Sequence, residues 1–407
     1  MRSDAARQVR NPGDNMRRAF TFLLVCQSYP PVIGGSEIEA QRVCTALIRR
    51  GHRVTVVCAG GPPMPNTRNW VDPDGVPVRI YAERWQGTLQ NIVFALRVAA
   101  MLIAERRNYQ FVYFLMQGLH LAAGLPVARM LKKPIIMKIA GSGEIPRVYK
   151  SRIGRQELAW LNRWASKILV LNEGMHQEAV NHGLLPRKLG WMPNPVDTKE
   201  FAPAKPEEER RLRCGFGIPK DAQVVMYAGR LAPEKGLCTL LEAFFLLARH
   251  NKRALLVLVG DGGMRDTLAL KARQFGLADK RVLFAGRVHP HEVSQWLKIA
   301  QVFALVSPAE GFSCALAEAM STAVPSVVSD IPANRQLIED GVHGVLTPVG
   351  DKEKVAAAIT ALLEDVSLRK QMGEMARQRI LENYSTEHII DRYESLFREI
   401  VANEAAS

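Results

Sequence analysis

The chain has few cysteines, few aromatic residues and no long uncharged apolar run. Its six cysteines are scattered without a Cys-x-x-Cys pair, so we expect core residues, not a zinc site or a disulfide framework, and a reducing cytoplasm. No uncharged apolar run reaches the roughly 18 residues of a membrane span. The polar, arginine-rich N-terminus also lacks the apolar core of a signal peptide. The sequence therefore predicts a chain that is neither secreted nor membrane-spanning.

Acidic residues are scarce in the first half of the chain. Residues 1–190 hold 27 Lys and Arg against 12 Asp and Glu, a net charge of +15, whereas residues 191–407 hold 27 against 28, a net charge of −1. This asymmetry favours a partner with phosphates or an anionic surface, because clustered Lys and Arg attract anions. A soluble basic face without a partner is the alternative. No nucleic-acid partner is predicted.

Two segments are candidates for a membrane-binding surface. Residues 144–167 mix basic residues with Tyr149, Trp160 and Trp164, as interfacial helices do, and residues 88–107 are strongly apolar with charged ends. Both segments are also compatible with core helices that have solvated faces. Peripheral association with the inner face of the cytoplasmic membrane is therefore one of two interpretations.

The length of 407 residues predicts two domains, since single cores rarely exceed about 250 to 300 residues. Residues 1–17 are predicted to form a disordered tail. In both halves, continuous apolar runs typical of buried parallel strands alternate with helical segments. The predicted strands cover residues 19–26, 52–60, 111–116, 134–140 and 167–172 in the first half, and residues 224–229, 254–262, 281–286, 302–308 and 325–330 in the second.

This alternation predicts two doubly wound parallel sheets of the Rossmann-like α/β class, joined by a polar linker near residues 195–220. Ligands of such sheets bind at the carboxyl ends of the strands. We therefore expect a cleft between the domains, lined by the loops that follow Cys26, Ala140, Gly229, Gly260 and Ser307.

Two loops carry features of anion sites. Gly34 and Gly35 precede a helix, which permits close approach of a ligand and leaves free N–H groups, although a plain turn has the same signature. Arg230 and Lys235 lie five residues apart after a strand, so both cations can converge on one diphosphate. An exposed basic turn is the alternative.

The segment SPAEGFSCALAEAM, residues 307–320, places two acids eight residues apart. A strand ends before Glu310, Ser313 is a suitable N-cap, and Glu318 lies more than one turn into the predicted helix. Free N–H groups of residues 312–315 would form an anion site at the helix start. Carboxylates on either side of a diphosphate suit the hydroxyl groups of a sugar and a ribose.

These motifs resemble those of the retaining glycosyltransferases of family 4. The resemblance is most specific where GRLAPEKG, VGDG, EGFSCALAEAM, PSVVSD and LIEDGVHGVLTP follow one another in the family's order. It implies the GT-B fold, in which two Rossmann-like, doubly wound parallel-sheet domains face each other across a cleft. It also implies an acceptor-side domain of residues 18–195 plus a returning C-terminal helix at about 386–407, and a donor-binding domain of residues 196–385.

The resemblance also implies a set of site residues. Glu310 would contact the donor sugar, and Glu318 would hold the ribose hydroxyls. Arg230 and Lys235 would neutralise the diphosphate, which makes Glu310, Arg230 and Lys235 the catalytic candidates. The other donor-binding candidates are Gly34, Gly35, Gly229, Gly260, Asp261, Phe312, Ser313, Cys314 and Val288, whose backbone would meet the nucleobase.

The implied reaction moves a sugar from a UDP-sugar or GDP-sugar to a glycan, lipid-linked or small-molecule acceptor, with retention at the anomeric carbon. Cations and helix N–H groups aimed at the leaving diphosphate contribute about 3 kcal/mol each, so neither a metal nor a cofactor is expected. The VDPDG segment at Asp72 is interpreted as a turn on the acceptor-side domain, and the HPHE segment at His289 as a surface loop, instead of metal sites.

One departure from the family pattern lies at Ala140, where members commonly have a histidine that contacts the donor sugar. The residues that could take over this contact are Ala140, Gly141, Ser142, Gly143 and Glu144. Ala323 and Gln336 stand where Gly and Glu are frequent. Two alternatives to a transferase stay open: a nucleotide-sugar isomerase of similar fold, and a donor-binding protein with little or no turnover.

Overall fold

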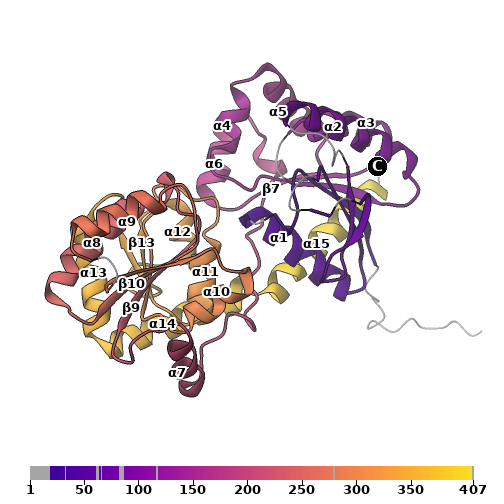
Figure 1. Cartoon of the computed structure of the whole chain (residues 1–407). Helices are drawn as coiled ribbons and strands as arrows, with labels where there is room; N and C mark the ends of the chain where they lie inside the picture. The colour runs from indigo at the N-terminus through magenta and orange to yellow at the C-terminus, as the bar shows by residue number, and fades with distance from the viewer. Residues whose placement is uncertain are drawn as a thin grey trace, which may run out of the picture.

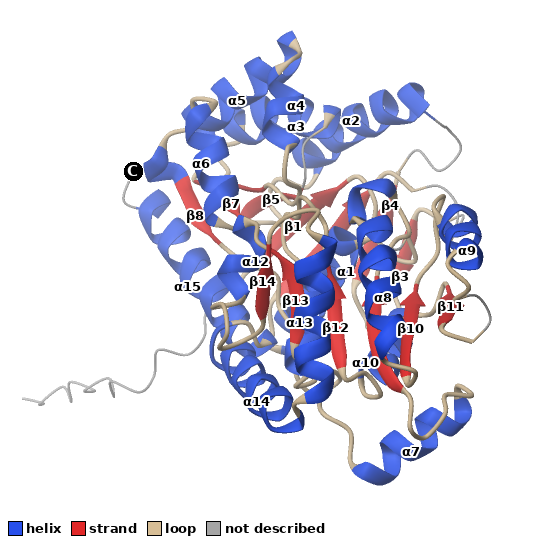
Figure 2. Cartoon of the chain, turned by 90° about the vertical axis from the view of Figure 1, so that its left-hand side faces the viewer, coloured by secondary structure: helices blue, strands red, loops and turns tan. Residues whose placement is uncertain are grey.

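The chain folds into two α/β domains that lie side by side (Figure 1). The structure is a computed structural model that describes residues 19–32, 34–60, 64–65, 67–81, 87–115, 118–277 and 280–405. The tail predicted for residues 1–17 lies outside the described residues. Each domain has a central sheet with helices packed against it (Figure 2).

The first sheet has eight strands in the order β3-β4-β2-β1-β5-β6-β7-β8. The strands are β1 (Thr21–Cys26), β2 (Arg53–Cys58), β3 (Asn69–Val71), β4 (Pro77–Ile80), β5 (Phe111–Leu115), β6 (Ile135–Lys138), β7 (Lys167–Val170) and β8 (Leu189–Trp191). Neighbours pair in parallel except β3 with β4. The central strands are continuous apolar runs because both faces of the sheet are covered, and every residue of β5 is buried.

Helices cover both faces of this sheet. Along β1, Leu23 and Val25 face one core, which α2 and α3 complete, whereas Phe22 and Leu24 face the other, which α1 and α15 complete. The helices are α1 (Gly35–Arg49), α2 (Gly87–Ala104), α3 (Leu119–Met130), α4 (Glu144–Tyr149), α5 (Arg152–Trp164), α6 (Glu173–Asn181) and α15 (Thr386–Ala405).

The second sheet has six parallel strands in the order β11-β10-β9-β12-β13-β14. The strands are β9 (Gln223–Ala228), β10 (Ala254–Val259), β11 (Val282–Gly286), β12 (Val302–Leu305), β13 (Ser326–Ser329) and β14 (Val345–Thr347). The helices are α7 (Pro206–Gly215), α8 (Leu237–His250), α9 (Arg265–Gln274), α10 (Pro290–Leu297), α11 (Cys314–Ser321), α12 (Pro332–Leu337), α13 (Lys352–Glu364) and α14 (Val366–Asn383). Chain order reverses between β9 and β12, which creates a topological switch point.

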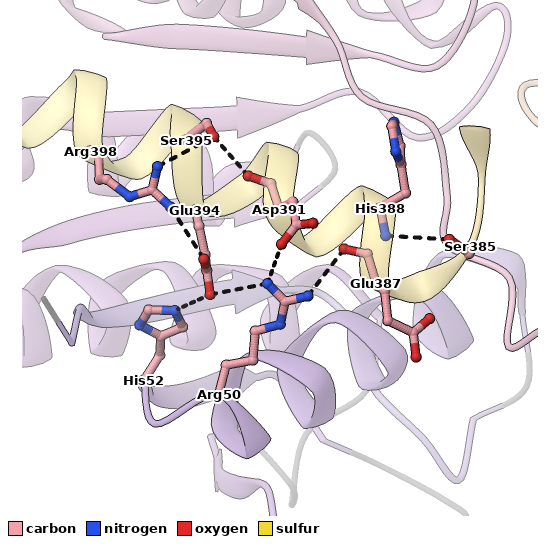
Figure 3. A network of polar contacts seen from close by, with 9 residues as sticks. All are labelled: Arg50, His52, Ser385, Glu387, His388, Asp391, Glu394, Ser395 and Arg398. Atoms are coloured by element: carbon pink, nitrogen blue, oxygen red, sulfur yellow. Dashed lines mark hydrogen bonds and ion pairs between the residues drawn. The ribbon is translucent and has the colours of Figure 1, made fainter. Parts of the chain in front are cut away.

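Helix α15 follows the second domain in the chain but packs against α1 of the first (Figure 1). Its apolar face joins the core beneath β1 and β5. Figure 3 shows the polar contacts beside that face: Arg50, just after α1, pairs with Asp391 and Glu394, and Nε2 of His52 lies 3.1 Å from Glu394. The last helix therefore completes the first domain.

The structure corrects several predictions. Strands β3, β4, β8 and β14 are not predicted from the sequence because each is short and lies at or next to the edge of its sheet, without the continuous apolar run of the central strands. The predicted linker at 195–220 contains α7, which starts at Pro206. The segment 144–167 contains two helices, α4 and α5, because Ser151 caps a new helix start, and it ends where β7 begins. The expectation that all cysteines are core residues is wrong for Cys214, which is exposed on α7.

Candidate active site

The carboxyl edge of the second sheet brings the motif loops together. The loops after β9 and β12 flank the switch point. The loop after β10 lies against the loop after β9: Gly260 has a φ of 130°, and a Cβ atom added there would overlap the carbonyl oxygen of Gly229. Open parallel sheets bind ligands at such a reversal. Gly229 and Gly260 therefore lie at the edge where a ligand of this fold would bind.

Two further predicted residues lie in the same set of loops. The carbonyl of Asp261 accepts a hydrogen bond from the backbone N–H of Leu231 at 3.0 Å. The N–H of Gly260 donates to the carbonyl of Gly286 at 2.8 Å, two residues before Val288. The loops after β9, β10 and β11 are thus held together through their backbones.

Glu310 and Lys235 meet at this edge. Lys235 ends a short 3-10 turn, and its Nζ atom lies 2.8 Å from Oε1 and 3.0 Å from Oε2 of Glu310. Both side chains are largely shielded from solvent. A cation in direct contact therefore neutralises an acid that would otherwise repel a phosphate.

Arg230 lies apart from this pair. Its side chain is 70% exposed and pairs with Glu234 at 2.6 Å within the same loop. The predicted convergence of Arg230 and Lys235 on one point is therefore not present in this structure, because different glutamates hold the two cations.

Glu318 lies on the buried face of α11 and is ion-paired across the two domains. Its Oε1 atom is 2.8 Å from a guanidinium nitrogen of Arg42, which comes from α1 of the first domain. The guanidinium also lies 5.4 Å from the ring centroid of Phe201. Burial raises the pKa of the Glu318 carboxyl, and the charge of Arg42 opposes that rise.

The start of α11 differs from the prediction in its hydrogen bonds. Ser313 is the N-cap residue, but its side chain makes no capping bond, and its hydroxyl donates to Oδ1 of Asn334 at 2.7 Å. The N–H of Cys314 donates to the carbonyl of Phe312 at 2.9 Å. The prediction that residues 312–315 all present free N–H groups is therefore wrong for Cys314, because a tight turn precedes the helix. The ring of Phe312 is buried.

Loops of the two domains touch at Gly311. A Cβ atom added to Gly311 would lie 2.9 Å from the carbonyl oxygen of Ala140. The side-chain amide of Asn172, the N-cap of α6, donates to the carbonyl of Gly311. The residue after Glu310 therefore packs against the loop that lacks the family's histidine.

Glu144 holds that loop in place. Its buried Oε2 atom accepts hydrogen bonds from the backbone N–H groups of Ala140 and Gly141, each at 3.2 Å. Burial raises the pKa of the Glu144 carboxyl, and the N–H of Gly141 opposes that rise. Ser142 and Gly143 are exposed. The backbone of its own loop thus engages the Glu144 carboxylate, and the Ala140 carbonyl is the group in contact with the second domain.

Gly34 and Gly35 lie at the start of α1, with Gly34 as its N-cap. The carboxylate of Glu37 lies where a Cβ atom of residue 34 would be, and it accepts hydrogen bonds from Ser28 Oγ at 2.5 Å and Ser36 Oγ at 3.0 Å. An acid thus lies beside this helix start. A phosphate next to the two glycines would require Glu37 to move.

A buried charge cluster beside the site was missed in the sequence. Lys138 on β6 is fully buried, pairs with Glu39 on α1, and donates to Asn194 Oδ1 at 3.1 Å and to the Tyr393 hydroxyl at 3.2 Å. A single lysine within an apolar strand was the available signal, since a buried ammonium requires a partner.

Asp72, in the segment predicted to form a turn, is buried and has structural partners. Oδ1 of Asp72 accepts the N–H groups of Asp74 and Val76 at 2.9 and 2.8 Å, and Oδ2 accepts the Tyr29 hydroxyl at 2.8 Å. Within the described ranges, no group of three or more His, Cys, Asp or Glu side chains has a metal-binding arrangement. Asp72 thus stabilises a turn.

Comparison with known proteins agrees with this geometry. The family models "Glycosyltransferase Family 4" and "Glycosyl transferases group 1" match residues 33–200 and 208–379. N-acetyl-alpha-D-glucosaminyl L-malate synthase of Bacillus anthracis is 25% identical over 391 residues, 92% of this chain and 96% of that protein. Alpha-D-kanosaminyltransferase of Streptomyces kanamyceticus is 28% identical over 282 residues, 67% of this chain and 72% of that protein.

Solved structures show the same fold. Anabaena HepE in complex with UDP and glucose aligns with a TM-score of 0.79 at 21% identity, covering 93% of this chain and 99% of that chain. WaaG, a glycosyltransferase involved in lipopolysaccharide biosynthesis, aligns with a TM-score of 0.72 at 17% identity, covering 92% and 99%. The predicted GT-B fold is thereby confirmed. Since both family models match in order and together span both domains, the chain belongs to the family 4 glycosyltransferases.

Proposed function

We propose that this glycosyltransferase takes its sugar from a UDP-sugar or GDP-sugar. The sugar is transferred with retention and without a metal ion to a glycan, lipid-linked or small-molecule acceptor. The observation that carries the proposal is the contact of Lys235 with both carboxylate oxygens of Glu310 at the switch point. It sets a cation for a phosphate beside an acid for sugar hydroxyls, as the junction of sugar and diphosphate requires.

The leaving group defines the first task of the site. Cleavage of the bond between the anomeric carbon and the diphosphate oxygen leaves negative charge on the nucleoside diphosphate. Lys235 offsets this charge when it shares its ammonium group between Glu310 and the donor. Arg230, which is paired with Glu234, would have to leave that acid and turn toward the donor to add a second cation. In a shielded site, loss of one such group typically lowers kcat by about 10² to 10³.

The sugar defines the second task. Glu310 accepts hydrogen bonds from sugar hydroxyls, and the carbonyl of Ala140, which meets Gly311 across the domains, supplies a further acceptor in place of the family's histidine side chain. The acceptor hydroxyl then attacks the anomeric carbon on the face that the diphosphate leaves. The new C–O bond forms as the old one breaks, and the departing phosphate oxygen takes the acceptor's proton.

Similar folds support the donor class. HepE, which shares the fold, was crystallised with UDP and with UDP-glucose. The curated relatives carry names of transferases and synthases that handle different sugars. A site that recognises diphosphate and ribose, with variable sugar contacts, is consistent with that range.

The test is to incubate the purified protein with UDP-sugars and GDP-sugars, with and without EDTA. We expect release of a nucleoside diphosphate that EDTA leaves unchanged, and a product whose anomeric configuration, read by NMR, equals that of the donor. An isomerised nucleotide sugar would instead favour the isomerase, and saturable binding without release would favour a donor-binding protein. An inverted product or loss of turnover in EDTA would contradict retention or metal independence.

Helix α2 of the first domain, the domain predicted to bind the acceptor, has an exposed apolar face. By length and composition alone, this helix could cross a membrane, and it is the only such helix in the described part of the chain. In this structure 28% of its residues are buried. One face packs into the first core through Phe94, Val98 and Leu102. The opposite face carries an exposed apolar row, the α2 row, made of Leu89, Ile92, Leu96 and Ile103.

We propose that the α2 row contacts an anionic membrane at the cytoplasmic face, where a lipid-linked acceptor would be available. Arg97 flanks the row, and Arg106 and Arg107 follow the helix, all exposed. An apolar row with flanking arginines suits acyl chains and acidic headgroups. The alternative segment is less suitable, because Trp160 and Trp164 stack at 5.3 Å and pack against the core.

Vesicle sedimentation tests this surface. We expect binding to phosphatidylglycerol vesicles that weakens with salt, and little binding to phosphatidylcholine vesicles. Leu96→Ser should weaken binding by about 10-fold to 100-fold, because a Leu side chain contributes about 1.5 to 3 kcal/mol on burial. Leu270→Ser, at an exposed apolar residue of the second domain, is the matched control. Equal effects of both variants, or a dimer that Leu96→Ser dissociates, would contradict the proposal.

A further inference from the structure

Arg42 links the first domain to the acid predicted to hold the donor ribose. Its guanidinium nitrogen lies 2.8 Å from Oε1 of Glu318, and the two side chains are 18% and 11% exposed. Among the described residues, no other cation pairs with Glu318, and none pairs with its Oε2 atom. The carboxylate is therefore half engaged, with one oxygen available.

Arg42 has little freedom to move. The ring of Phe201 lies beneath its guanidinium, and one turn earlier α1 is fixed by the buried pair of Glu39 with Lys138. Asn194 accepts from Lys138 at 3.1 Å and lies 3.5 Å from the sulfur atom of Cys314, at the start of the helix that carries Glu318. A guanidinium held in this way fixes the orientation of the carboxylate with which it pairs.

We infer that Arg42 is a positioning residue for the donor, which holds Glu318 through Oε1 so that Oε2 can accept the ribose hydroxyls. The inference rests on the proposed function, since it requires a ribonucleotide at this site. It implies that a nucleotide bound mainly by the second domain is recognised through a residue of the first. Ribose recognition then depends on contact between the domains.

A different role for Arg42 would be that of an interdomain strut. A strut would weaken the binding of every nucleotide equally, because it acts on the domain arrangement. A positioning residue would weaken only the ligands whose ribose uses Glu318. Discrimination between ribose and deoxyribose therefore separates the two roles.

The experiment measures, by calorimetry, the binding of UDP and GDP and of their 2′-deoxy and 3′-deoxy counterparts. In the wild type, loss of the contacting hydroxyl should weaken binding about 10-fold to 100-fold, as expected for a hydrogen bond to a charged group. In Arg42→Gln, the ribonucleotide should bind about tenfold more weakly, and the deoxy ligand should change by less than about twofold. Arg49→Gln, at an exposed arginine of α1, is the matched control and should behave as wild type.

Two further variants keep the inference testable if Arg42→Gln fails to fold. Arg42→Lys keeps the positive charge but has fewer hydrogen-bond donors. It should therefore keep part of the ribose discrimination that Arg42→Gln loses. Glu318→Gln should cause the same loss as Arg42→Gln, and the double variant should add nothing further. Equal weakening of ribo and deoxy ligands, or unchanged discrimination in Arg42→Gln, would overturn the inference alone. A wild type that binds no nucleoside diphosphate would overturn the proposed function with it.

The pH dependence of binding is an independent readout. Glu318 must be ionised to accept hydroxyl hydrogens, and the groups that face it are Arg42 from α1, Cys314 from its own helix and Glu200 from the domain connection. Burial raises the pKa of Glu318, and Arg42→Gln removes the charge that opposes this rise. Affinity should therefore decline at a higher pH in the variant than in the wild type as pH is lowered. Coinciding profiles would contradict the inference.

Discussion

The two domains place their charges differently. In the first domain, Lys138 and Glu39 form a pair that is buried within the core. In the second domain, Lys235 and Glu310 form a pair at the edge of the sheet, in loops that follow strands. A core pair is fixed by packing, whereas a pair at a loop edge can exchange partners with a ligand. The difference teaches that similar ion pairs can be fixed within the core of one domain and stay accessible to a ligand at the sheet edge of the other.

The largest effect is expected from breaking the core pair. Lys138→Met should lower the free energy of unfolding by about 3 to 5 kcal/mol, because Glu39 then stays buried without a counter-charge. Replacing both, as in Lys138→Met with Glu39→Leu, should recover most of the loss. Urea unfolding of the single and double variants measures this. If the single variant were as stable as the wild type, the pair would not be structural.

Breaking the edge pair should affect rate instead of stability. Glu310→Gln should lower kcat by about 10² to 10³ while the affinity for nucleoside diphosphate changes by less than about threefold, because the diphosphate lacks the sugar that Glu310 contacts. Glu234→Gln, which removes the acid paired with exposed Arg230, is the matched control. Near wild-type turnover in Glu310→Gln would remove its catalytic assignment.

A third prediction concerns a buried acid in the first domain. Burial raises the pKa of Glu157 on α5 to about 7, so the folded state binds a proton that the unfolded state releases near its ordinary pKa of 4.5. Stability from this group is present at low pH and is lost as pH rises through about 7. Glu157→Gln should therefore stabilise the protein by about 1 to 2 kcal/mol at pH 8 and by little at pH 4.5.

Melting temperatures at the two pH values measure the effect of Glu157→Gln. Gln156→Ala, at the exposed neighbouring residue, should change the melting temperature equally at both. A stabilisation that does not depend on pH would contradict the explanation by proton binding.

The smallest effect is expected at two matched backbone positions, one in each domain. Lys132 and Ala323 have φ values of 53° and 59°, a region that disfavours residues with a Cβ atom. Lys132→Gly and Ala323→Gly should each stabilise the protein by about 0.5 to 1 kcal/mol, because relief of strain exceeds the entropy lost by glycine. Ala357→Gly, within α13, should destabilise it by a similar amount. Gains at only one of the two positions would limit the explanation to that site.

Family members frequently have glycine at the position of Ala323, and the positive φ of this residue explains that preference. The sequence of one chain does not reveal this backbone conformation. The predicted segments that agree with the structure are those with strong local patterns: the apolar runs of β1, β5 and β10, and the helical spacing of α1. Strand β3 pairs antiparallel at a sheet edge, and α7 lies in a polar segment. Pairing and packing decide such elements, and neither has a clear local pattern.

The candidate site also contains one contact that the sequence predicts and one that it does not. The proximity of Lys235 and Glu310 follows from two loops that flank one switch point, so the order of motifs was sufficient to predict it. The pairing of Arg42 with Glu318 depends on how α1 of one domain faces α11 of the other. No spacing in the sequence encodes that contact.

The sequence by itself determined the alternation of strands and helices, the family and the residues available for chemistry, because these depend on local periodicity and on motifs of a few residues. Only the tertiary structure decided which charges are buried, which acid holds which cation, and where the two domains touch. Those properties arise from burial and from the relative placement of distant elements, and the free energy of an ion pair depends on both.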